Sequence, residues 1–83
     1  MGRFYFHVRK GDELIPDEEG RDLADQAAAR QEALLAAREV LAEAIKAGKD
    51  QVPDAFVIAD EAGRSVGTVP LVNVLPKRFK VGQ

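Results

Sequence analysis

The feature that most constrains this fold is an uninterrupted stretch, residues 26–47, that contains neither glycine nor proline. Nine of its 22 residues are alanine, the residue with the highest helix propensity. Asp25 precedes the stretch, and its carboxylate can accept a hydrogen bond from an amide of the first turn. Gly48 follows it, at the position where helices commonly end in a left-handed residue. The sequence therefore predicts one long helix over residues 26–47.

The predicted helix has a stripe of small side chains along one face. At 100° per residue this stripe consists of Ala29, Ala33, Ala36, Ala37, Val40, Ala44 and Ala47. Small side chains let a helix axis lie close to a sheet. We expect Leu34, Leu41 and Ile45 to fill space along one margin of the stripe, whereas Leu35 falls on the polar side.

Two strands are predicted before the helix. Residues 3–9 alternate, so that one face carries Phe4, Phe6 and Val8, and the other carries the polar and aromatic residues between them. The glycine and aspartate of residues 10–12 indicate a turn. A short second strand follows over residues 13–15 and stops at Pro16, because proline cannot donate to a strand ladder. We interpret residues 16–25 as a loop that leads into the helix.

Two further strands are predicted after the helix. Residues 55–59 are a continuous apolar run, typical of a central strand that is covered on both sides. Residues 65–71 form the fourth strand, in which Pro70 marks an edge or an end. Residues 72–75 add a short turn or helical cap. The pattern does not determine the strand order.

The predicted fold class is α+β with the order ββαββ. One long helix packs on one face of a four-stranded, mainly antiparallel sheet. We expect residues 1–76 to form a single domain and residues 77–83 to form a disordered basic tail. One helix covers one face only, so the other face is either solvated or covered by a second copy, a partner, or the segment of residues 72–75 folded back.

Composition removes several classes of function. The chain has no cysteine, which excludes a disulfide framework, a thiolate zinc site and a cysteine nucleophile. The formal net charge of −2 gives no overall basic footprint for duplex nucleic acid. No apolar run reaches membrane-spanning length, and the N-terminus has no apolar signal region. We therefore expect a cytoplasmic domain with no membrane association, no cofactor and no small-molecule substrate.

Several short motifs resemble a family of short bacterial proteins that carry a domain of unknown function. The resemblance extends over about residues 3–75. Its motifs are Phe6-His7-Val8-Arg9 with Gly11-Asp12, Pro16-Asp17-Glu18-Glu19-Gly20, the alanine-rich helix, Asp60-Glu61-Ala62-Gly63, and Val69-Pro70. This resemblance implies a compact cytoplasmic domain and implies no catalytic or binding site.

A second resemblance is to the antitoxins of small RNA-targeting toxin–antitoxin pairs. It rests on the turn at residues 16–20 ahead of the helical residues 25–44. The predicted sheet is not followed by a DNA-binding segment, which distinguishes this chain from that pattern. We keep a nucleic-acid-binding or antitoxin-like regulator as the alternative function.

The candidate binding residues lie on the outward face of the first strand: Arg3, Tyr5, His7 and Arg9. Aromatic and arginine side chains are favoured at protein interfaces. Interleaved on an open sheet, they also resemble a platform for single-stranded nucleic acid. We expect this face to bind a protein partner or a second copy of the chain.

No catalytic or metal site is predicted. Ser65 and His7 are the only serine and histidine in the chain, and no supporting motif joins them. Residues 12–25 contain half of the chain's 14 acidic residues, but their spacing does not match a calcium-binding loop. The sequence leaves open whether this acidic loop binds a cation. We expect a non-catalytic protein.

Overall fold

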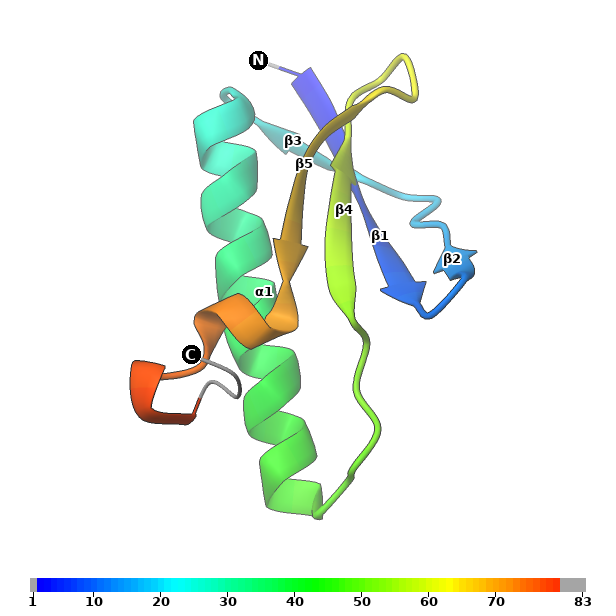
Figure 1. Ribbon diagram of the computed structural model, residues 1–83. Coiled ribbons are helices and arrows are strands. Elements are labelled where there is room, and N and C mark those ends of the chain that lie inside the picture. The colour runs from blue at the N-terminus through cyan, green and yellow to red at the C-terminus, as the bar shows by residue number, and fades with distance from the viewer. Residues whose placement is uncertain (1, 80–83) are drawn as a thin grey trace.

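The computed structural model describes residues 2–79 and confirms an α+β fold (Figure 1). One helix packs against an antiparallel sheet, as predicted. In chain order the elements are β1 (Gly2–Lys10), β2 (Glu13–Ile15), β3 (Arg21–Leu23), α1 (Gln26–Ala47), β4 (Ala55–Ala59), β5 (Ser65–Pro70) and the 3-10 helices η1 (Leu71–Val74) and η2 (Lys77–Phe79).

Within residues 2–79 the sheet has five strands rather than the predicted four. The additional strand is β3, which lies in the stretch predicted as a loop. It pairs antiparallel with the start of β1, Phe4 opposite Arg21, whereas β2 pairs with the end of β1, Val8 opposite Ile15. Both short strands therefore flank the same edge of β1. β4 pairs with the other edge of β1 and β5 with β4, so the order is β2-β1-β4-β5 with β3 beside β2 along β1.

The boundaries of α1 follow from its two caps. The Asp25 carboxylate accepts a 2.8 Å hydrogen bond from the Ala28 amide, and Gly48 ends the helix at φ 69°. The alanine stripe is the contact with the sheet, since Ala29, Ala33 and Ala37 have no exposed surface. Small side chains at these positions let α1 lie directly on the strands.

One leucine and one isoleucine of α1 test the predicted placement of large apolar side chains beside the alanine stripe. Leu35 is exposed, as its place on the polar side predicts. Ile45 was expected to fill space beside the alanine stripe, but this prediction is wrong: 72% of its surface is exposed. Ile45 lies in the last turns of α1, close to the cap at Gly48.

The core lies between α1 and the face of the sheet that carries alternate residues of β1, β4 and β5. Its buried side chains are Phe4, Ala29, Ala33, Ala37, Phe56, Ile58, Val69 and Leu71. Leu71 and Val74 bring η1 onto this same core, beside α1. The segment after β5 therefore packs on the helix side of the sheet and does not fold back over the opposite face.

The face of the sheet opposite α1 has no second layer within residues 2–79 (Figure 1). The central position predicted for residues 55–59 is confirmed, because β4 lies between β1 and β5. The prediction that both of its faces are covered is confirmed in part. On the side opposite α1, Ala55 and Ala59 are buried, whereas Val57 between them is half-buried and no layer of residues 2–79 lies over it.

Two further expectations concern the membrane and the C-terminal segment. In the part of the chain that the structure describes, no helix has both the length and the apolar character needed to cross a membrane. Of the predicted tail, Lys77–Phe79 form η2, and residues 80–83 lie outside the described residues.

Candidate functional site

The four residues predicted for binding all lie on β1, and residues of β4 and β5 lie beside them on the same face of the sheet. Tyr5, His7 and Arg9 of β1 are paired with residues of β4, and His7 lies opposite Val57. Val57 in turn lies opposite Thr68 of β5. Directly opposed residues share one face of a sheet. We call this surface the open face and define it by Tyr5, His7, Arg9, Val57 and Thr68.

An aromatic pair forms the centre of the β1 part of the open face. The rings of Tyr5 and His7 are stacked, with centroids 6.4 Å apart and planes inclined by 16°. Both side chains are half-buried, although no other layer covers them. Arg9 follows on the same face, exposed, and within residues 2–79 it forms no ion pair. These three side chains give the open face an aromatic centre and a cationic margin.

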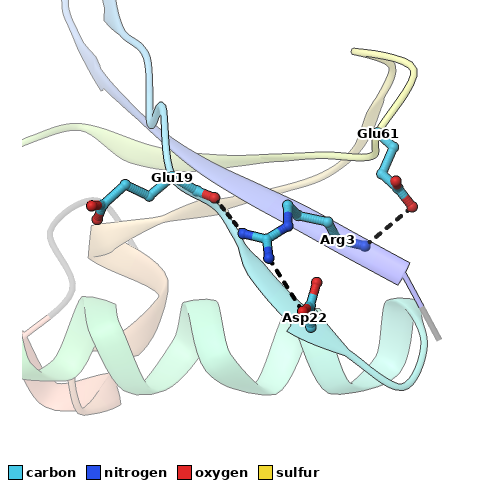
Figure 2. Close-up of polar contacts among 4 residues, drawn as sticks. All are labelled: Arg3, Glu19, Asp22 and Glu61. Atoms are coloured by element: carbon cyan, nitrogen blue, oxygen red, sulfur yellow. Dashed lines mark hydrogen bonds and ion pairs between the residues drawn. The ribbon is translucent and has the colours of Figure 1, made fainter.

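Arg3, the fourth predicted residue, is engaged elsewhere (Figure 2). Its guanidinium donates a 2.6 Å hydrogen bond to the backbone carbonyl of Glu19 and a 3.2 Å hydrogen bond to the carboxylate of Asp22 in β3. Its backbone amide donates to the Glu61 carboxylate at 3.3 Å. The structure therefore brings together Tyr5, His7 and Arg9, while Arg3 ties the start of β1 to its neighbours.

Between β2 and β3, residues 16–20 interrupt the ladder at the edge of β1. We call this segment the insert. In place of a strand, the Asp17 carboxylate accepts a 3.1 Å hydrogen bond from the Phe6 amide of β1. Its other oxygen accepts hydrogen bonds from the amides of Glu19 and Gly20. A single side chain thus replaces the missing main-chain partner of β1 and also holds the turn of the insert.

The insert also contacts the aromatic pair. The Asp17 amide donates a 3.0 Å hydrogen bond to Nδ1 of His7. This hydrogen bond fixes the orientation of the imidazole ring. Gly20 lies against Tyr5 and has φ +70°, and a Cβ atom there would lie 2.8 Å from Cε2 of the Tyr5 ring. The insert therefore positions both rings of the open face.

Hydrogen bonding determines the ionisation of two aspartates. Partial burial alone would raise the pKa of Asp17, but the amides of Phe6, Gly20 and Glu19 and the nearby His7 outweigh it and hold this pKa below its ordinary value. At Asp60 the amide of Arg64 and its charge lower the pKa despite some loss of hydration. A lowered pKa favours the ionised form of both carboxylates, and both accept hydrogen bonds from backbone amides of their own turns.

The remaining acidic side chains of residues 12–25 do not assemble. Asp25 caps α1, Asp22 pairs with Arg3, and Asp17 binds backbone amides. In the described part of the chain, no three acidic or histidine side chains are grouped as ligands of a metal ion. Asp17 and Asp22 thus stabilise the edge of β1, and Asp25 stabilises the start of α1.

Sequence reasoning missed the contributions of Asp17 and Gly20 to this site. Both were noted only as part of the turn and motif at residues 16–20, and Asp17 also as part of the acidic stretch. The available signal was their spacing, Asp17-x-x-Gly20, because an aspartate that accepts hydrogen bonds from amides two and three residues later forms a local turn that favours glycine. The position of the insert against β1 required the strand pairing.

These features define a small α+β domain with one helix and one open sheet face. The chain belongs to the family described as domain of unknown function DUF6894, whose model matches residues 3–72. The family therefore covers β1 to the start of η1, including the insert and the open face. No curated protein and no solved structure matches the chain.

Proposed function

We propose that this protein is a non-catalytic protein-interaction module that binds a protein partner through its open face. The observation that carries the proposal is the Tyr5–His7 stack, two half-buried rings on a sheet face that no layer of residues 2–79 covers. Aromatic and arginine side chains make the largest contributions at protein interfaces. We further infer that the module acts in the bacterial cytoplasm, since its composition is free of cysteine.

The charges around the open face favour a protein over a nucleic acid. Of the two arginines predicted for this face, Arg3 is already paired with Asp22. The adjacent insert carries Asp17, Glu18 and Glu19, whose carboxylates repel phosphate groups. A single-strand platform requires a basic groove along the stacked bases, and only Arg9 remains to supply positive charge among the open-face residues.

The environment of His7 supports a role without catalysis. Its Nδ1 accepts a hydrogen bond from the backbone amide of Asp17, so that nitrogen is occupied by the fold. Within residues 2–79, no hydrogen bond joins His7 to a hydroxyl group that it could activate. The imidazole is positioned as part of a surface.

The proposal is tested by partner capture followed by mapping with the purified partner. Proteins captured from the source cell by the full chain are compared with those captured by Tyr5→Ala and Arg9→Ala, and Leu35→Ala serves as an exposed control on α1. Arg9→Ala removes an exposed side chain, so it keeps the test valid if Tyr5→Ala fails to fold. The captured protein is then purified and titrated into isotope-labelled chain.

We expect amide shifts centred on Tyr5, His7, Arg9 and Val57, and a loss of binding in the two open-face variants alone. Short mixed-sequence RNA and DNA are titrated in parallel. Shifts on the open face that appear with nucleic acid and fade with salt would replace the proposal with the alternative function. Binding and oligomeric state that are unchanged in both Tyr5→Ala and Arg9→Ala would also overturn it.

A further inference from the structure

The outer edge of β5 is a second surface with unused binding capacity. Within residues 2–79, β5 pairs with β4 alone, and no loop or side chain hydrogen-bonds to Val66, Gly67, Thr68 or Val69. The strand Ser65–Pro70 carries no charged residue. Charges and interruptions are the common means by which proteins protect sheet edges. β5 has no charge, and its register shift at Val66 and its terminal Pro70 leave Gly67, Thr68 and Val69 as the regular part of the edge.

The ladder shows which main-chain groups face outward. The Leu71 amide donates to the Asp54 carbonyl at 3.0 Å, so position 71 faces β4. Main-chain groups alternate along a strand, and positions 69 and 67 therefore also face β4. The N–H and C=O of Thr68 point away from β4. Pro70, which has no N–H, occupies the next outward position, as expected for an edge strand.

We propose that β5 pairs antiparallel with β5 of a second copy of this chain, about a two-fold axis at Thr68. The two sheets then form one continuous sheet. This inference uses the main-chain edge of β5, whereas the proposed function uses side chains of the open face, to which the side chain of Thr68 belongs. It does not rest on the proposed function. Its chemistry is main-chain hydrogen bonding by an edge strand.

Three properties of β5 favour a second copy as its partner. In a two-fold pairing the two strands are identical, so a charge at or beside the axis would lie close to its own copy in the second strand. β5 has no charge and avoids this repulsion. Centred on Thr68, the register places threonine opposite threonine, a favourable cross-strand pair. It also places Gly67 opposite Val69 of the second copy, so a residue without a side chain faces a large one.

The pairing also ends at two copies. The opposite edge of the sheet is divided between β2 and β3, with the insert between them. A further strand cannot run along that edge without crossing the insert. The expected assembly is a closed dimer with twice the 9.0 kDa mass of the chain.

The test is the oligomeric state of the full chain, measured by analytical ultracentrifugation from micromolar to millimolar concentration. Thr68→Pro removes the outward N–H while the β4 ladder keeps its own hydrogen bonds. Because two hydrogen bonds of the dimer are lost, we expect association to weaken by about tenfold or more. Thr68→Val keeps the N–H and the shape of the side chain and serves as the matched control.

A second variant keeps the test decisive if Thr68→Pro does not fold. Thr68→Lys places two like charges across the two-fold axis, so the dimer weakens at low salt and partly recovers at high salt. A chain that stays monomeric at every concentration would overturn the inference. A dimer that both variants leave intact but Tyr5→Ala disrupts would overturn it too, and would place the contact between copies on the open face.

Discussion

The two edges of the sheet differ in how their main-chain groups are satisfied. Along β1, the edge is divided between two three-residue strands, and the Asp17 carboxylate binds the Phe6 amide between them. The strands on this edge carry the charged residues Glu13, Arg21 and Asp22. At β5 the edge is a six-residue strand with no charge and, within residues 2–79, no second partner.

The comparison shows that one aspartate can close a sheet edge that a strand would otherwise occupy. The insert supplies a side-chain acceptor to β1 and at the same time obstructs the approach of another strand, as β-bulges and edge charges do elsewhere. It also holds the rings of Tyr5 and His7. The protected edge therefore shapes the open face, while the unprotected edge remains available for pairing.

The largest expected effect on the protected edge comes from Gly20→Ala. Its Cβ atom would meet both the Tyr5 ring at 2.8 Å and the Phe4 carbonyl at 3.0 Å, at a φ of +70°. We expect the free energy of unfolding to fall by about 3 kcal/mol, from left-handed strain together with the clash. Urea denaturation followed by circular dichroism measures the change.

Gly11→Ala is the matched control for this substitution. Gly11 also has a positive φ, +58°, but a Cβ atom there would have no neighbour within 4 Å. Left-handed strain alone predicts a loss of about 1 kcal/mol. Equal losses for the two variants would show that the packing of Tyr5 on the insert is unimportant.

Asp17→Ala is expected to have the next largest effect. It leaves the part-buried Phe6 amide and two amides of the insert without their acceptor. The expected loss is about 2 kcal/mol of unfolding free energy, measured by the same denaturation. Asp17→Asn keeps one oxygen acceptor and should lose less. An unchanged free energy of unfolding in Asp17→Ala would contradict the assignment of Asp17 as the residue that satisfies the main-chain groups of this edge.

The Asp17 contribution also depends on pH. Because the folded pKa of Asp17 lies below its unfolded value of 3.8, its stabilisation is fully present above the unfolded pKa. It is lost as the pH falls through the folded pKa. Denaturation of the wild type from neutral to acidic pH should show this loss, and the corresponding slope should be smaller in Asp17→Asn. The pKa of Asp60 is also lowered. Asp60 therefore adds the same pH dependence to the unfolding free energy of both proteins, and this contribution cancels when the two slopes are compared.

The smallest expected effect is the salt-dependent part of the loss in Arg3→Met. The Arg3–Asp22 ion pair is exposed on both sides, and such pairs contribute about 0–1 kcal/mol. Arg3→Met also removes the hydrogen bond to the Glu19 carbonyl, so only the part of the loss of unfolding free energy that shrinks as salt is added measures the ion pair. Arg30→Met, on the exposed surface of α1, should have no salt-dependent effect, since within residues 2–79 Arg30 forms no ion pair. A salt-independent loss in Arg3→Met would show that the ion pair does not contribute.

The elements with strong local signals could be predicted from the sequence. The helix from Gln26 to Ala47 follows from propensity and its two caps, and β1, β2, β4 and β5 follow from alternation, turns and an apolar run. β3 could not be predicted, because Arg21-Asp22-Leu23 is short, has two charged residues and shows no alternation. It is a strand because β1 is long enough to pair with it.

The sequence predicted that the candidate binding residues share one face of β1, but it did not predict the contacts that these residues make. Alternation along β1 places Tyr5, His7 and Arg9 together, and the structure extends this surface to Val57 and Thr68. The engagement of Arg3 by Glu19 and Asp22 depends on the insert and on β3. Likewise, Ile45 is exposed although the adjacent Ala44 is buried, so the buried face of α1 is narrower here than the helical pattern predicts. Such long-range contacts leave no mark in a local pattern.

Amide hydrogen exchange, followed by NMR at two protein concentrations, tests the difference between the two edges most directly. The Phe6 amide is bound by Asp17, so it should exchange slowly at both concentrations. The Thr68 amide should exchange rapidly in the dilute protein and slow down as the concentration rises. A Thr68 amide that exchanges at the same rate at both concentrations, or a Phe6 amide that exchanges as fast as that of Thr68, would contradict this picture of one closed and one available edge.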